Sequence, residues 1–296
     1  MILGNQPPKV ALIGGNGFIG SAIYKDFKNS KIQIIPTSRN LNGLGKDFIK
    51  LDVFNENTWI DLLDGYKPNI VIFTAWDTEH LEYWQKSINF DFAKAVKNFA
   101  NACFNSNVSH FIGLGSCSEY GFSPGKCNSK TTPLNPQDPY SEAKVMASID
   151  LELISNNYGK KANWIRLFQP YGFKEKPQRL IPSLISNMRE DKSIYIKTPN
   201  DTLDFIHTDD VASLIRMIGL GDYEYSVNIG TGTATSISNL ALFLSDVLNF
   251  PREKIYFDNS DFQQKRSVYV DPDSDIFNDV WKPKYSLFEG LFHLLS

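Results

Sequence analysis

The chain has 296 residues, of which 42% are hydrophobic and 21% charged, and its formal net charge is −3. This balance is typical of a soluble globular protein of one large or two smaller domains, and it offers no basic excess for binding nucleic acid or an acidic membrane. The three cysteines and four histidines follow no disulfide or metal-ligand spacing. Since no apolar run is long enough to cross a membrane, we expect a cytoplasmic protein with reduced thiols and no metal.

The most informative motif lies near the N-terminus. An apolar run at 10–13 is followed by Gly14, Gly17 and Gly20 and then by an amphipathic run. A strand, a glycine turn and a helix in this order predict a dinucleotide site, with the pyrophosphate at the start of the helix. The alternative is a glycine-rich turn without a ligand. The cofactor-binding candidates in this motif are Gly14, Gly17, Phe18 and Ile19.

The end of the second predicted strand bears on the choice of cofactor. Sites that prefer NAD usually have Asp or Glu about 20 residues after the glycine turn, where the carboxylate binds the ribose 2′-hydroxyl. Here Ser38 and Arg39 occupy that place, and both suit a 2′-phosphate. NADP is therefore favoured over NAD, unless Arg39 is only a solvated charge. Asp52 and Val53, at the end of a short predicted strand, are candidates for contact with the adenine.

Strands and helices alternate through the first half of the chain. Apolar runs predict strands at 31–37, 46–52, 69–75 and 110–115, and apolar residues at helical spacing predict helices at 21–27 and 87–105. This alternation predicts an α/β fold with a doubly wound parallel sheet, in which ligands bind outside the carboxyl ends of the strands. Phe73, Thr74 and Ala75 end one such strand and are further cofactor-binding candidates. Residues 76–85 and 121–139 are expected to be loops.

Three residues are arranged for acid-base catalysis. Ser116 ends a predicted strand, and Tyr140 and Lys144 begin a predicted helix that runs to about 156. Residues four apart lie on one face of a helix, so the Lys144 ammonium can lower the pKa of the Tyr140 phenol from its usual value of ~10. Ser116 can then hold a substrate oxygen while Tyr140 transfers a proton. The alternative for Tyr140 and Lys144 is an ordinary surface pair.

The chain resembles the extended short-chain dehydrogenase/reductases of the nucleotide-sugar epimerase/dehydratase type. The matching segments are 14–20, 52–53, 116–121, 140–144, 166–172 and 204–212. The resemblance implies a Rossmann domain of residues 1–168, to which 204–230 returns, and a smaller C-terminal substrate-binding domain of 169–203 and 231–296. It also implies that Lys144 holds the nicotinamide ribose. Finally, it implies a homodimer in which the helices at 87–105 and 140–156 form a four-helix interface.

The substrate-binding candidates lie mostly in the second half of the chain. The amide of Gln169 can reach a sugar or diphosphate oxygen, and an arginine fork such as that of Arg266 suits a diphosphate. The resemblance implies that Leu180 lies against the nucleotide and that Arg266 binds the diphosphate, whereas Arg179 can equally belong to a solvated basic loop. The remaining candidates are Ser116, Cys117 and Ser118.

Departures from the family pattern narrow the expected reaction. Cys117 and Ser118 stand where the 4,6-dehydratases have Asp-Glu, so dehydration is not expected, and members that epimerise and reduce have a cysteine where this chain has Ser118. Leu203 replaces an arginine common before Asp204, which removes or displaces one phosphate contact. We therefore expect NADPH-dependent reduction of the C4 keto group of a nucleoside-diphosphate 4-keto-6-deoxyhexose, in deoxysugar or surface polysaccharide biosynthesis. The alternatives are a 4-epimerase with tightly bound NAD and a non-catalytic cofactor-binding protein.

Overall fold

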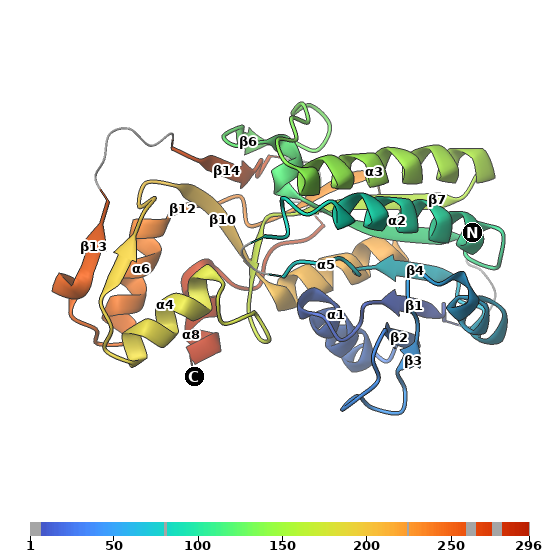
Figure 1. Ribbon diagram of the computed structural model, residues 1–296, viewed down its shortest axis with the longest axis horizontal. Coiled ribbons are helices and arrows are strands. Elements are labelled where there is room, and N and C mark those ends of the chain that lie inside the picture. The colour runs from blue at the N-terminus through green and yellow to red at the C-terminus, as the bar shows by residue number, and fades with distance from the viewer. Residues whose placement is uncertain (1–6, 80–81, 224, 259–264, 274–279, 296) are drawn as a thin grey trace.

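A parallel sheet forms the centre of the larger part of the molecule in the computed structural model (Figure 1). The structure describes residues 7–79, 82–223, 225–258, 265–273 and 280–295. Within these residues, seven strands lie in the order β11-β7-β5-β4-β1-β2-β3, and every neighbouring pair is parallel. Their bounds are β1 (Val10–Ile13), β2 (Ile34–Ser38), β3 (Ile49–Lys50), β4 (Ile70–Phe73), β5 (His110–Ser116), β7 (Lys161–Leu167) and β11 (Ser226–Ile229).

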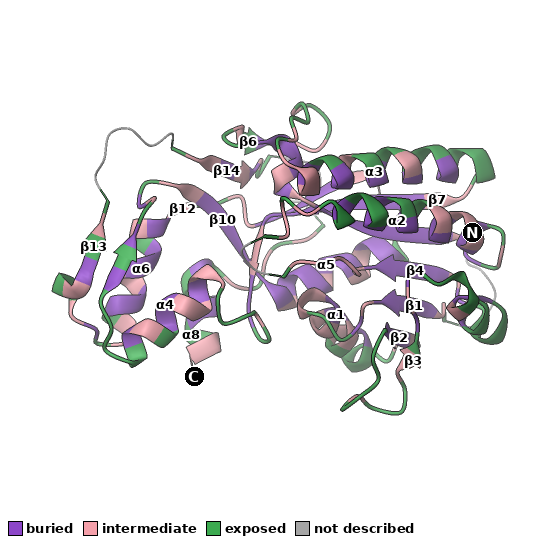
Figure 2. Ribbon diagram, in the orientation of Figure 1, coloured by how far each residue is buried: buried purple, intermediate pink, exposed green. Residues whose placement is uncertain are grey.

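Helices cover both faces of this sheet, so the expected doubly wound α/β fold is confirmed. On one face, α2 (Ile88–Phe104) packs against α3 (Pro139–Tyr158), and on the other α1 (Phe18–Asn29) packs against α5 (Thr208–Leu220) (Figure 1). The central strands are buried between these layers (Figure 2). Their burial on both faces explains why they read as continuous apolar runs in the sequence.

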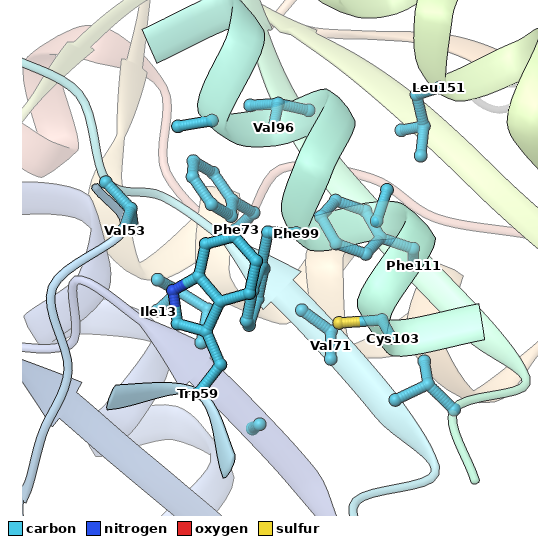
Figure 3. Close-up of a cluster of buried hydrophobic side chains, with 14 of the residues drawn as sticks. Ile13, Val53, Trp59, Val71, Phe73, Val96, Phe99, Cys103, Phe111 and Leu151 are labelled. Atoms are coloured by element: carbon cyan, nitrogen blue, oxygen red, sulfur yellow. The ribbon is translucent and has the colours of Figure 1, made fainter. Parts of the chain in front are cut away.

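Aromatic rings fill the core between the sheet and α2. Phe73 of β4 and Phe111 of β5 lie next to Phe99 of α2, and the ring of Trp59 is 5.0 Å from that of Phe99, centroid to centroid (Figure 3). One face of α3 completes this core through residues at helical spacing, namely Ala143, Ala147 and Leu151. This packing fixes the rotation of α3, and with it the direction in which the predicted catalytic side chains point.

The second part of the molecule has its own sheets and core. One sheet has the order β12-β10-β14-β6, with β8 on β10, and β9 pairs with β13. The strands are β6 (Gly125–Cys127), β8 (Gln169–Tyr171), β9 (Ile194–Ile196), β10 (Thr202–His207), β12 (Ala234–Ser236), β13 (Ile255–Phe257) and β14 (Ser267–Val270). The helices are α4 (Leu180–Arg189), α6 (Ile237–Val247) and α8 (Leu287–Leu295). The short helices among the described residues are η1 (Glu56–Thr58), η2 (Asp61–Tyr66), η3 (Cys117–Tyr120) and η4 (Arg252–Lys254).

Two segments cross between the predicted domain ranges. β6 lies within 1–168 but pairs with β14 in the second sheet, and β10 belongs to that sheet although the range 204–230 begins inside it. In contrast, α5 and β11 of the same range do return to the central sheet. β6 therefore belongs to the second part, although it lies between β5 and α3 in the sequence.

Most predicted elements agree with the structure to within a few residues, and the exceptions have local causes. The loop expected at 121–139 contains β6, because this short strand has a partner in β14, about 140 residues later. The strand expected at 46–52 contracts to β3, an edge strand with two residues paired to β2. The first helix begins at Phe18, not at 21, because it starts directly from the glycine turn. In the described part of 76–85 there is no helix or strand.

Candidate active site

The carboxyl ends of the central strands open onto a cavity of about 570 Å³, lined by residues of both parts of the molecule. The predicted site residues that line this cavity are Gly17, Phe18, Ile19, Thr74, Ser116, Cys117, Ser118, Tyr140, Lys144, Gln169, Arg179, Leu180 and Arg266. The other cofactor-binding candidates do not line the cavity. They lie at or just after the carboxyl ends of β1, β2, β3 and β4. The predicted catalytic and substrate-binding residues are thus brought together.

The glycine turn connects β1 to α1. Gly14 has a φ of 83°, which side chains rarely adopt, and a Cβ at Gly20 would overlap the carbonyl oxygen of Gly14. Gly17 is the N-cap of α1 and provides no side-chain cap, so the first N–H groups of the helix are open to an anion. The hydroxyl of Thr74 donates to the carbonyl oxygen of Ile13 at 2.7 Å and joins β4 to β1, where the strand order reverses. This turn fits a pyrophosphate.

The candidates for the adenosine side have different surroundings. Ser38 is buried, and its hydroxyl donates to the carbonyl oxygen of Asn40 at 2.7 Å, whereas Arg39 is exposed. The Asp52 carboxylate accepts from the backbone N–H of Phe54 at 3.0 Å and so stabilises its own turn. Arg39 is therefore the exposed member of the predicted pair, and Ser38 the buried one.

Three other cofactor candidates are partly or wholly buried. Val53 and Phe73 are buried, and the ring of Phe73 packs in the core beneath α2. Ala75 packs against the edge of the same core. Because its ring is buried in the core, Phe73 could contact a ligand only through its backbone.

The start of α3 is set by its capping residues. Asp138 accepts a hydrogen bond from the backbone N–H of Ser141 at 2.8 Å, and Pro139 occupies the first turn, where its missing N–H is not needed. The backbone N–H of Tyr140 donates to the carbonyl oxygen of Trp84 at 3.0 Å. These contacts place Tyr140 in the first turn and tie it to the aromatic loop after β4.

Tyr140 and Ser116 both line the cavity and are hydrogen-bonded to each other. Burial raises the pKa of the Tyr140 phenol, the neighbouring Tyr83 raises it further, and a hydrogen bond with Ser116 lowers it. The Ser116 hydroxyl also accepts hydrogen bonds from the backbone N–H and the hydroxyl of Ser118, at 3.2 and 2.8 Å. A buried phenol that stays protonated at neutral pH is suited to donate a proton to a substrate oxygen.

Lys144 lies one helical turn after Tyr140 and is almost completely buried. Its ammonium nitrogen donates to the carbonyl oxygen of Leu114 at 2.6 Å and lies 5.7 Å from the centroid of the Tyr140 ring. Burial lowers the pKa of the Lys144 ammonium, whereas the charge of Glu119 raises it. Burial, and not the Lys144 charge, dominates the pKa of the Tyr140 phenol, so the lowering expected from the sequence is not found.

A buried ionic network beneath Ser116 was not predicted from the sequence. The carboxylate of Glu119 accepts hydrogen bonds from the backbone N–H of Ser116 at 2.8 Å, the indole of Trp164 at 3.1 Å and the guanidinium of Arg166 at 2.7 Å. The signal that would have found it is Arg166 itself, since a charge within an apolar strand needs a buried partner. Glu119 therefore holds the turn that carries Ser116, the predicted catalytic serine.

The predicted substrate residues include one buried group without a partner. Arg266 is held by its backbone N–H, which donates to the Asp201 carboxylate at 2.8 Å, while its buried Nε has no hydrogen-bond partner among the described residues. A buried donor without a partner is costly, so this group fits an anionic ligand in the cavity. The Gln169 amide donates to the sulfur of Cys117 at 3.6 Å.

Glu175 is a cavity residue that was not predicted from the sequence. Its Oε2 atom is buried without a hydrogen-bond partner among the described residues. Burial raises the pKa of its carboxyl to about 7, although the charge of Arg179 lowers it. In the sequence, Glu175 is one charge in a loop that also contains Lys174 and Lys176, and nothing in the sequence pattern distinguishes it.

The described residues contain no group of three or more His, Cys, Asp or Glu side chains that could hold a metal ion, and none of their helices is long and apolar enough to cross a membrane. The cysteines Cys103, Cys117 and Cys127 are free and buried.

Comparison with known proteins identifies the family. Residues 10–230 match the model of the NAD dependent epimerase/dehydratase family. The chain belongs to this family. The family resemblance noted in the sequence is thereby confirmed, as is the expectation of an enzyme of the oxidoreductase type.

The relatives include both dehydratases and epimerases. A dTDP-D-glucose 4,6-dehydratase of Dictyostelium discoideum is 28% identical over 78% of this chain and 60% of its own length. Two crystal structures share the fold. A UDP-glucose 4-epimerase from Thermotoga maritima with UDP-glucose has a TM-score of 0.82 at 21% identity, over 97% of both chains. A dTDP-glucose 4,6-dehydratase from Bacillus anthracis with NAD has a TM-score of 0.80 at 20% identity, over 97% of this chain and 95% of the other.

Proposed function

We propose that this protein reduces the C4 keto group of a nucleoside-diphosphate 4-keto-6-deoxyhexose with NADPH. The observation that carries the proposal is that Ser116, Tyr140 and Lys144 line one cavity with the turn around Gly17 and with Arg266, whose buried Nε has no partner among the described residues. A proton donor, a nicotinamide site and a diphosphate site in one cavity are the requirements of such a reduction. In the dehydratase pattern, carboxylates follow the catalytic threonine, and here Cys117 and Ser118 take their places.

The cofactor would be held by the β1–α1 turn and by the ends of the neighbouring strands. Gly14, Gly17, Phe18 and Ile19 would face the pyrophosphate, and Lys144 would reach the nicotinamide ribose. When bound, the nicotinamide supplies or accepts the hydride. Arg39 supports NADP because it is a cation at the place where NAD sites usually have a carboxylate.

The protein's own residues would orient the substrate and move the proton. Ser116 would hold the C4 oxygen, and Tyr140 would donate the proton to that oxygen while Lys144 stabilises the charge left on the phenol. Arg266, Arg179 and Gln169 would hold the diphosphate and sugar. Leu180 would lie against the nucleotide.

A 4-epimerase with retained NAD is the second candidate. It is favoured by the similarity to a UDP-glucose 4-epimerase and by the use of the Ser38 hydroxyl within its own turn. The same residues would serve it, since Tyr140 would then accept and return one proton. A non-catalytic cofactor-binding protein is a third reading, which intact Ser116, Tyr140 and Lys144 argue against.

We also propose that the protein is a cytoplasmic homodimer. The outward face of α3 exposes Met146, Ile149 and Leu153, which are 49%, 51% and 57% exposed (Figure 2). Three large apolar side chains at helical spacing are costly to leave in water, and a second copy of α2 and α3 would cover them.

The deciding experiment measures loss of the near-ultraviolet absorbance of reduced nicotinamide. Purified protein is mixed with NADPH or NADH and a nucleotide 4-keto-6-deoxyhexose that a 4,6-dehydratase generates in place. Stoichiometric loss of NADPH supports the reductase. Interconversion of 4-epimers without added cofactor, and no consumption of either reduced cofactor, would move the assignment to the epimerase.

A further inference from the structure

The indole of Trp76 lies directly on the catalytic ammonium group. Trp76 follows β4 by three residues, and the ammonium nitrogen of Lys144 lies 3.5 Å from the centroid of its ring. The edge of Tyr140 meets the same indole, with ring centroids 6.2 Å apart and planes at 89°. Trp76 thus touches both partners of the predicted acid-base pair.

The position of this indole is fixed by α2. Its N–H donates to the side-chain oxygen of Asn89 at 2.8 Å, and its ring stacks on Phe92 with centroids 5.3 Å apart. Asn89 is fully buried, and its amide donates to the carbonyl oxygens of Tyr83 and Lys86 at 2.5 and 2.8 Å. The indole is therefore rigid, and its face is presented to Lys144.

A buried lysine needs such contacts to stay charged. Burial favours the neutral amine, and the groups that oppose it come from each element packed on Lys144. These are the Glu119 carboxylate of η3, itself paired with Arg166 of β7, the Leu114 carbonyl of β5 and the rings of Trp76, at 3.5 Å, and of Trp164 in β7, at 5.8 Å. Tyr140 faces it from its own helix. An aromatic face at this distance favours the cation, most strongly where water is excluded.

We propose that Trp76 is a positioning residue that keeps Lys144 protonated and aimed at Tyr140. An ammonium group has three N–H donors. The Leu114 carbonyl takes one and the indole face takes another, which leaves one for the ligand side. The importance for catalysis rests on the proposed function, whereas the effect of Trp76 on Lys144 does not.

The direct test is a pH titration of Lys144 by NMR in protein carrying isotope-labelled lysine, without cofactor. The Lys144→Met variant assigns the signal. We expect the titration midpoint to fall in the order wild type, Trp76→Phe, Trp76→Leu, by about one pH unit in the leucine variant. The matched control is Phe92→Leu, which alters the packing behind the indole but keeps the contact, and its midpoint should stay near that of the wild type.

Fluorinated tryptophan gives a second route that does not depend on the stability of the leucine variant. Fluorine weakens the negative potential of the ring face with little change in shape. Incorporation should lower the Lys144 midpoint in the wild type and leave it unchanged in Trp76→Phe, which controls for the other four of the five tryptophans. Equal midpoints in labelled and unlabelled wild type, or in wild type and Trp76→Leu, would overturn the proposal.

Turnover separates this inference from the proposed reaction. If Lys144 acts as a cation, activity falls as pH rises through its pKa, so the alkaline limb of kcat should move to lower pH in Trp76→Phe. A purely structural role would lower kcat at every pH and leave that limb in place. If no nucleotide sugar is converted at all, the proposed function fails, and the NMR titration still decides the role of Trp76.

Discussion

Arg166 and Glu119 form an ion pair at 2.7 Å in which the two side chains are 4% and 0% exposed. The same carboxylate accepts the backbone N–H of Ser116 and contributes to a capping box with that residue. Buried charges are tolerated where they are paired and hydrogen-bonded. The stability of the fold and the geometry of the proposed active site therefore depend on one carboxylate.

Removing this charge should destabilise the protein strongly. Glu119→Gln leaves the Arg166 guanidinium buried without a counter-charge, for which we expect a loss of about 3–5 kcal/mol in the free energy of unfolding, measured by urea denaturation. The control is Asp246→Asn, which breaks the exposed pair with Arg252 and should cost at most about 1 kcal/mol. Similar losses of unfolding free energy in the two variants would mean that burial does not determine how much the Glu119–Arg166 pair stabilises the protein.

Tyr140→Phe tests the proton donor alone, because it removes the phenol oxygen and keeps the ring. We expect turnover to fall by ~10²-fold or more, with cofactor affinity measured by fluorescence titration nearly unchanged. Tyr195→Phe, on an exposed tyrosine of β9, is the matched control and should keep full activity. A fully active Tyr140→Phe enzyme would remove Tyr140 from the mechanism.

Local motifs and topology account for what the sequence could predict of this site. The spacing of Tyr140 and Lys144 places them on one face of a helix. Because the strands are parallel, Ser116 and Thr74 lie together at the carboxyl ends of neighbouring strands. The contacts that were missed join distant segments. The Lys176 ammonium reaches the Thr78 carbonyl oxygen at 3.4 Å, and the Arg179 guanidinium lies over the Tyr83 ring. Glu175, in the same loop, lines the cavity. Hydrophobic periodicity predicts the buried face of a helix or strand, but it does not predict which residues a loop contacts.

Arg39→Ala tests cofactor choice. If Arg39 binds the 2′-phosphate, its removal should lower the affinity for NADPH about 10-fold or more, which is the scale of one hydrogen bond to a charged group. The affinity for NADH should be unchanged. Calorimetric titration with both cofactors measures this, and NADH serves as the internal control. Equal losses of affinity for NADPH and NADH would contradict a role for Arg39 in binding the 2′-phosphate.

The proposed dimer can be tested on the outward face of α3. Leu153→Glu places a charge among exposed apolar side chains that a partner copy would bury, so we expect a dimer to become a monomer by light scattering after size-exclusion chromatography. Tyr195→Glu introduces the same charge on β9, where the tyrosine is 74% exposed, and should not change the mass. A wild-type monomer would rule out the interface directly.

Glu175 should make the stability of the protein depend on pH. Burial raises the pKa of its carboxyl in the folded protein to about 7, above its ordinary value of 4.5. The folded state therefore binds this proton more tightly than the unfolded chain, and the resulting stabilisation, present below the unfolded pKa, is lost as pH rises through about 7. Glu175→Gln stays neutral and should lose less stability between about pH 5 and about pH 8, by on the order of 2 kcal/mol.

Urea denaturation of both proteins at these two pH values measures the difference. Since other groups titrate in the same range, the quantity to compare is the change in unfolding free energy with pH, variant against wild type. Glu253→Gln is the matched control, because this exposed carboxylate of η4 should leave that change as it is in the wild type. The same pH dependence in wild type and Glu175→Gln would mean that the Glu175 carboxyl is as well solvated in the folded protein as in the unfolded chain. Its position in the wall of the cavity would then carry no cost that a ligand could relieve.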